Sequence, residues 1–123
     1  FSSDGRPDLV VANTTADSVT ILPGRGTGFF DPPTHLPANS NPKQVAVADL
    51  NADGCPDFVV SCGLSRKIWI YLGNGSGKFF FGGALDATRP QDVKVGHFNS
   101  DTKPDLAVVN TTANGEVGVL LQL

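Results

Sequence analysis

Short runs of β-branched and aromatic residues alternate with clusters of glycine, proline, asparagine and aspartate along the whole chain. Runs of roughly four to eight such residues, bounded by turn-forming residues, are typical of β-strands. The apolar positions show no helical period. The clearest part of the pattern predicts four strands, at about Gln44–Leu50, Asp57–Cys62, Lys67–Leu72 and Lys78–Leu85. The chain is therefore predicted to be all-β.

The pattern repeats along the sequence. Asp4 and Asp53 are 49 residues apart and Asp53 and Asp101 are 48 apart, each within a similar acidic loop. A glycine-rich turn at 73–77 matches the turn at 24–28. Units of about 40–50 residues are typical of four-stranded propeller blades. The sequence predicts one propeller segment, 1–123, of about ten antiparallel strands: a partial blade at 1–41, a complete blade at 42–89 and a partial blade at 90–123.

The middle acidic loop, Asp49–Asp57, reads D-L-N-A-D-G-C-P-D. It carries carboxylate or amide oxygens at loop positions 1, 3, 5 and 9, with a glycine at 6. Ca²⁺ prefers mixed carboxylate, amide and carbonyl oxygens, and the glycine permits a sharp turn. An EF-hand is disfavoured because no flanking helices are predicted. The simpler interpretation is that these residues only form turns by bonding to the backbone.

The loop, combined with the G-N-G-S-G-K-F turn, resembles the FG-GAP/VCBS family, which includes the propellers of integrin α-subunits, fungal lectins and secreted repeat proteins. The resemblance covers essentially the whole chain. It implies that the loop binds Ca²⁺ between two strands of a blade, in a structural rather than catalytic role. The implied ligands in the middle loop are Asp49, Asn51, Asp53, the backbone carbonyl of Cys55, and Asp57.

The two outer loops depart from the family pattern. The first begins after position 1, so an upstream residue or a neighbouring chain would have to complete it. The third has His97 at position 1 and Thr102 at the glycine position, which predicts a weaker site. The implied ligands are Ser2, Asp4, the Arg6 carbonyl and Asp8 in the first loop, and Asn99, Asp101, the Lys103 carbonyl and Asp105 in the third.

Cys55 and Cys62 are the only cysteines. An extended strand would separate them by up to ~23 Å, beyond the reach of a disulfide. Three interpretations stay open: free or buried thiols, bonds to other chains or other parts of this one, and a distorted local bridge. Three sequons, at Asn13, Asn74 and Asn110, are possible glycosylation sites in a secreted protein.

Composition narrows the function. The net charge is -3, and no basic cluster suggests nucleic-acid binding. No apolar run is long enough to span a membrane, and no catalytic motif is present. We therefore expect a non-enzymatic, secreted, Ca²⁺-stabilised propeller module for adhesion, recognition or assembly. Its partner would be a protein or glycan, with self-association through open strand edges or completion by the rest of a longer propeller. The alternative is a lectin, for which Trp69 and Tyr71 could supply aromatic contacts; inter-blade packing is the competing interpretation of these two residues.

Overall fold

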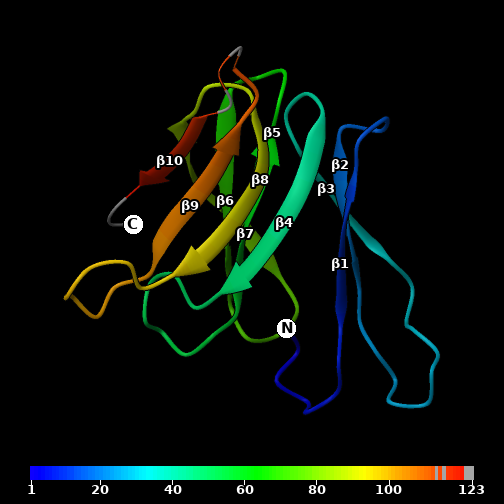
Figure 1. The fold of residues 1–123 in the computed structure, drawn as a ribbon. Helices are drawn as coiled ribbons and strands as arrows, with labels where there is room; N and C mark the ends of the chain where they lie inside the picture. Colours follow the sequence, from blue (N-terminus) through cyan, green and yellow to red (C-terminus); the bar gives the residue numbers. More distant parts are fainter. Residues whose placement is uncertain (113, 115, 121–123) are drawn as a thin grey trace.

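A computed structural model describes residues 1–112, 114 and 116–120, and these residues form three antiparallel sheets with no helix (Figure 1). The prediction of an all-β fold with one complete and two partial blades is thus confirmed. The strands are β1 (Leu9–Asn13), β2 (Ser18–Leu22), β3 (Thr34–Pro37), β4 (Pro42–Ala48), β5 (Asp57–Cys62), β6 (Lys67–Gly73), β7 (Phe79–Asp86), β8 (Pro90–Gly96), β9 (Asp105–Asn110) and β10 (Glu116–Leu120).

Each sheet is built from strands that follow one another in sequence. The orders are β1-β2-β3, β4-β5-β6-β7 and β10-β9-β8. The sheets lie side by side as complete or partial propeller blades, and they do not close into a ring (Figure 1). The third predicted blade spans 90–123, of which residues 113, 115 and 121–123 lie outside the described part.

The predicted ends of the middle strands need correction. β4 begins at Pro42 and ends at Ala48, whereas the pattern predicted Gln44–Leu50. Pro42 pairs with Cys62 across a register shift before Gln44, so the proline occupies the first position of the strand, where a missing N–H is tolerated. At the other end, Leu50 belongs to the acidic loop. β6 and β7 also end one residue later than predicted.

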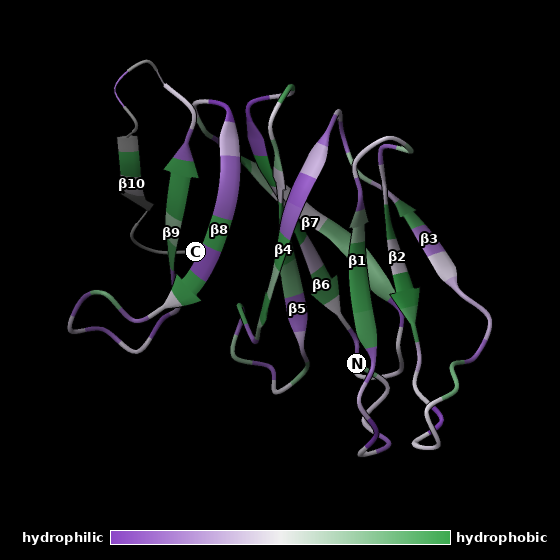
Figure 2. Ribbon diagram, turned by 45° about the vertical axis from the view of Figure 1, so that its right-hand side comes forward, coloured by the Kyte–Doolittle hydropathy of each residue, from purple (hydrophilic) through white to green (hydrophobic). Residues whose placement is uncertain are grey.

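Two hydrophobic clusters hold the three sheets together. The first lies between the first two sheets and includes Ile21, Phe58 and Val60. The second lies between the second and third sheets and includes Val59 and Leu106. Side chains alternate across a strand, so β5 serves both clusters and all six of its residues are buried. Figure 2 shows the hydrophobic residues along β1 and β9 that accompany this packing.

Trp69 and Tyr71 belong to the packing between the first two sheets. Tyr71 is buried, stacks on Phe58 and donates a hydrogen bond to the Pro37 carbonyl. Trp69 is partly buried against the same cluster, with its ring 4.8 Å from that of Phe81. The structure therefore favours the inter-blade interpretation of these two aromatics over an exposed sugar-binding face.

Candidate metal-binding loops

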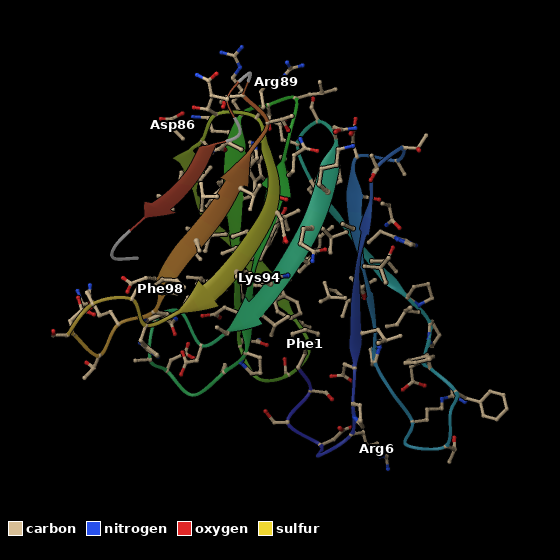
Figure 3. All side chains as sticks on the ribbon, in the orientation of Figure 1. Phe1, Arg6, Asp86, Arg89, Lys94 and Phe98 are labelled. Atoms are coloured by element: carbon tan, nitrogen blue, oxygen red, sulfur yellow. The ribbon has the colours of Figure 1, made fainter. Side chains whose placement is uncertain are left out.

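The three acidic loops gather at one end of the sheets. Residues 49–56 join β4 to β5, residues 97–104 join β8 to β9, and residues 1–8 precede β1. Figure 3 shows Phe1 and Arg6 of the first loop and Phe98 of the third loop toward this end. Arg89 lies at the opposite end. All the residues predicted to hold Ca²⁺ therefore lie at the same end of the molecule.

The aspartate at loop position 9 has the same backbone partner in every loop. Its Oδ2 accepts a bond from the nitrogen of position 2, at 2.6 Å for Asp8, 2.8 Å for Asp57 and 2.7 Å for Asp105. Asp57 and Asp105 have no exposed surface. Buried carboxylates need such partners, because an unpaired buried charge is costly. The position-9 aspartate is thus an integral part of the fold.

The other oxygen of this aspartate reaches the glycine-rich turn of the same blade. Asp8 Oδ1 accepts from Gly24 N at 2.7 Å, and Asp57 Oδ1 accepts from Gly73 N at 2.7 Å. Asp57 therefore fastens the loop that starts β5 to the end of β6. One buried side chain thus satisfies two backbone donors, one in the acidic loop and one at the end of β6.

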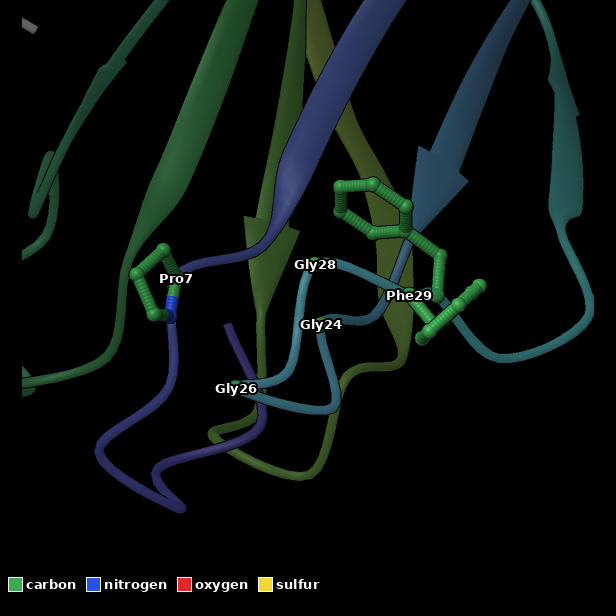
Figure 4. Close-up of a pocket in the computed structure, with 6 residues that line it drawn as sticks. Pro7, Gly24, Gly26, Gly28 and Phe29 are labelled. Atoms are coloured by element: carbon green, nitrogen blue, oxygen red, sulfur yellow. The ribbon is translucent and has the colours of Figure 1, made fainter.

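The turn can approach the loop only because it begins with glycine. A Cβ atom on Gly24 would lie 1.9 Å from the Pro7 carbonyl oxygen, and one on Gly73 would lie 2.2 Å from that of Pro56. Figure 4 shows Gly24 beside Pro7, in a depression of about 240 Å³ that Phe29 also lines. The repeated pairing of acidic loop and glycine turn in the sequence therefore reflects direct contact between them.

The remaining acidic side chains fold the loop itself. Position 5 accepts from the N–H of position 7 in each loop, at 2.9 Å for Asp4, 2.7 Å for Asp53 and 2.9 Å for Asp101. In the middle loop, Asp49 accepts from Asp53 N at 3.2 Å and Gly54 N at 2.8 Å. Asn51 accepts from Asp53 N at 3.1 Å and donates to its carboxylate at 2.9 Å. These are the turn-forming bonds of the simpler interpretation.

The first two loops share a backbone conformation that the third lacks. Position 4 has a left-handed φ in both, 53° at Ser3 and 61° at Ala52, and so does the glycine at position 6, 76° at Gly5 and 81° at Gly54. The left-handed residues of the described chain include none in 97–105. Thr102 stands at the glycine position there, and a β-branched residue is strained at positive φ. The third loop accordingly takes another path.

His97 closes the third loop by a hydrogen bond. Its Nδ1 lies 2.9 Å from the carbonyl oxygen of Lys103, the predicted ligand at position 7. Because a carbonyl can only accept, the ring nitrogen is the donor. The His97 ring thus links loop positions 1 and 7, which in the other loops' pattern would both be ligands of a bound cation. The third loop fits a metal less well than the sequence pattern alone indicated.

Electrostatics indicate that the acids of the middle loop act on a common region. The pKa of the Cys55 thiol is raised by burial, by its bond to Asp53, and by the charges of Asp53, Asp49 and Asp57. The pKa of Asp53 is lowered, first by the bond from Cys55 N–H and then by Asn51. Burial favours a higher pKa for Asp8, but bonds from the N-terminal ammonium, Gly24 and Ser2 outweigh it and lower the pKa.

The donor chemistry of the middle loop suits Ca²⁺, while its side chains are arranged around backbone N–H groups. Carboxylates at positions 1, 5 and 9, an amide at 3 and a carbonyl at 7 are the oxygen types that Ca²⁺ takes. Among the described residues, no three His, Cys, Asp or Glu side chains are grouped tightly enough to hold a metal ion as they stand. A cation would have to draw Asp49, Asp53 and Asp57 closer together.

The two cysteines are free thiols. Cys62 is the last residue of β5, and Cys55 lies in the acidic loop two residues before the strand begins. Cys62 is fully buried between the first two sheets, and burial, followed by the charge of Asp17, raises its pKa to about 12. Cys55 is half-buried in the acidic loop. The structure thus contains no bridge between the two, and Cys62 has no exposed surface.

The three sequon asparagines have different surroundings. The Asn13 amide donates to Ser18 Oγ at 3.2 Å and Thr20 Oγ1 at 2.7 Å. Asn110 Oδ1 is buried without a hydrogen-bond partner in the described part of the chain. Asn74 is exposed at the glycine-rich turn, where its Oδ1 caps Ser76 N at 3.0 Å. Of the three, Asn74 presents the most accessible amide.

Comparison with known proteins supports the repeat assignment. The family model of the FG-GAP-like repeat matches residues 1–60, which span the first two acidic loops. No curated protein and no solved structure matches the chain. No helix among the described residues is long and apolar enough to cross a membrane.

Proposed function

Residues 1–60 belong to the FG-GAP-like repeat family, and from this we propose that the chain is a Ca²⁺-stabilised β-propeller module acting outside the cell in adhesion, recognition or assembly. Repeats of this family are typically found in extracellular domains and are generally non-enzymatic. The family match and the blade-like sheets support a propeller-type repeat module directly. Calcium binding, secretion and partner recognition are the proposed part.

The middle loop carries the proposal. It offers Asp49, Asn51, Asp53, the Cys55 carbonyl and Asp57, a complete set of oxygen donors, and its three carboxylates all act on the Cys55 thiol. Such neighbouring charges repel one another, and a divalent cation relieves that repulsion. The first loop has the same left-handed backbone and supplies Ser2, Asp4, the Arg6 carbonyl and Asp8. The third loop is proposed to stay metal-free because His97 already bonds to the Lys103 carbonyl.

Calcium titration tests this proposal. A ligand that binds only the folded state stabilises it by about 2.7 kcal/mol at one hundred times its Kd. We expect the melting temperature to rise with Ca²⁺ and fall with EGTA, and Asp53→Ala to remove most of the rise. Asp86→Ala is the matched control, because this exposed aspartate pairs with Lys67 far from the loops. If the melting temperature of the unmutated chain does not change with Ca²⁺, the proposal is contradicted.

Open sheet edges and faces supply the proposed assembly surfaces. β1 and β10 each form one edge of an incomplete sheet. Val109 and Val117 are 43% and 68% exposed on the third sheet, although Val108 beside Val109 is buried. An unpaired edge is a template for another strand. Further blades of the same polypeptide, or a second copy, can complete these sheets. A sedimentation measurement that finds only stable monomers at high concentration contradicts the second route.

A further inference from the structure

A depression with a volume of about 260 Å³ lies at the end of the sheets opposite the acidic loops, where the second and third sheets meet. Its lining includes the charged residues Lys43 and Arg89, the amides of Asn41 and Gln91, and the Thr111 hydroxyl. None of the described residues that line it is acidic. We propose that this depression binds an acidic saccharide unit through its carboxylate or sulfate. The proposal does not depend on Ca²⁺ binding.

The opening exists because a glycine replaces a side chain found at the neighbouring junction. Thr14 and Gly63 hold equivalent places after β1 and β5. Between the first two sheets, the Thr14 hydroxyl bridges the junction by donating to the Pro42 carbonyl at 2.7 Å. Between the second and third sheets, a Cβ on Gly63 would lie 3.3 Å from the equivalent Pro90 carbonyl. Gly63 has no side chain, so the second junction stays open.

The rim of the depression is fixed by unusual backbone. Asn41 and Arg89 both have left-handed φ, 67° and 54°, and each precedes a proline that starts an inner strand. The Asn41 carbonyl accepts from Gly63 N at 3.1 Å, and the Arg89 carbonyl accepts from Thr111 N at 3.1 Å. Non-glycine residues rarely take this conformation, and when they do they are often part of a functional site. These two backbone hydrogen bonds fix the positions of Asn41 and Arg89 at the rim.

The charges favour an anion. Neither Lys43 nor Arg89 has an ion-pair partner in the described part of the chain. The Asp17 carboxylate accepts from Asn41 N at 2.7 Å and does not line the depression. The acidic loops lie a seven-residue strand away, about 20 Å at ~3.3 Å per residue. This exceeds the Debye length of about 8 Å, so the acidic loops do not repel an anion here.

The other groups favour a sugar as the carrier of that anion. Asn41, Gln91 and Thr111 can exchange hydrogen bonds with ring hydroxyls. Leu64, 66% exposed, offers an apolar surface at the same rim. A concave site with a few convergent polar groups is the usual form of a small-molecule site. An acidic sugar unit satisfies the cations, the amides and the apolar edge together.

The test is an NMR titration of the isotopically labelled chain with trigalacturonate. We expect shifts in the amide signals of Gly63, Gln91 and Thr111. Two unit charges about 4 Å apart interact by ~1 kcal/mol in water, which is roughly fivefold in affinity. Lys43→Gln and Arg89→Asn should each weaken binding about fivefold. Asparagine is chosen at position 89 because it tolerates positive φ. Lys78→Gln, an exposed cation at the opposite end, is the matched control and should change nothing.

Gly63→Thr adds a steric test, since it reproduces the side chain that closes the neighbouring junction. We expect it to abolish binding while the spectrum stays well dispersed. Equal binding of neutral maltotriose, or an equal loss with Lys78→Gln, overturns the proposal. Inorganic sulfate or tetraglutamate with the same footprint and affinity overturns the assignment to a saccharide. If a variant fails to fold, the shift map of the unmutated chain alone still decides whether the ligand contacts this depression.

Discussion

Asp57→Asn separates the structural role of a position-9 aspartate from its proposed role as a metal ligand. The Asp57 side chain has no exposed surface and accepts from Leu50 N at 2.8 Å and Gly73 N at 2.7 Å. Asparagine has nearly the same volume, so the substitution leaves no cavity. Its amide, however, has one acceptor oxygen and one donor nitrogen. One of the two backbone N–H groups must therefore face another donor.

The cost follows from these two bonds. A hydrogen bond to a charged group contributes ~1.5–3 kcal/mol, and a buried donor left without a partner costs ~1–3 kcal/mol. These two energies overlap, because losing the charged acceptor and leaving the N–H unpaired are partly the same event. We expect Asp57→Asn to destabilise the chain by about 2–4 kcal/mol. Small domains have only ~5–15 kcal/mol of stability in total, so the loss should be large.

Urea unfolding in EGTA measures this effect with calcium removed. Asp53→Asn is the control. Asp53 is exposed, and water can replace its carboxylate as the acceptor for the Cys55 N–H. We expect the control to lose less than ~1 kcal/mol without calcium. In Ca²⁺ both variants would also lose a proposed ligand, so the comparison in EGTA is the one that isolates the structural role of Asp57. If both variants lose the same stability in EGTA, our account of Asp57 is wrong.

Three further predictions follow from the loops and thiols. His97→Asp combined with Thr102→Gly should raise the number of Ca²⁺ ions bound by one, measured by isothermal titration; an unchanged number contradicts the hydrogen-bond role of His97. Asp8 has a lowered pKa in the folded state, so its contribution is present above the ordinary value of 3.8 and is lost as pH falls through the lower folded value. Asp8→Asn should therefore flatten the acid limb of stability recorded by urea midpoints. Cys62, with a pKa of about 12 and no exposed surface, should stay unmodified by Ellman's reagent in the native chain, while half-buried Cys55 reacts; equal rates would mean that the first sheet does not cover β5.

Much of the fold could be predicted because the repeats are marked locally. β5 has the predicted bounds, Asp57–Cys62, since a loop aspartate and a turn bracket an apolar run. The start of β4 was misplaced because Pro42 pairs through a register shift, which depends on the neighbouring strand. The alternation on β6 favoured inter-blade packing for Trp69 and Tyr71 without excluding an exposed face, and their contacts with the core between the first two sheets depend on the position of the first sheet.

The site was predictable in residue type and less so in geometry. The bond from Gly73 to Asp57 joins residues 16 apart, and only the register of β5 against β6 brings them together. The contact between Gly73 and the Pro56 carbonyl has a sequence signal, the fixed offset between loop and turn. From the sequence, His97 was predicted to be a poor ligand, and in the structure its ring nitrogen bonds to the Lys103 carbonyl. Its bond to Lys103 depends on the altered backbone of the third loop.

The three loops together show which part of the motif the fold requires. The third loop has lost the acid at position 1 and the glycine at position 6, yet Asp105 keeps the position-9 bond to Phe98 N at 2.7 Å. In the first loop the amino group of Phe1 takes the same place on Asp8. Position 9 is therefore needed whether or not the rest of the loop suits a cation. Positions 1, 3 and 5 are exposed in the middle loop and can vary without disturbing the core. The position-9 bond thus lets the blades keep their structure whether or not the other loop positions suit a cation.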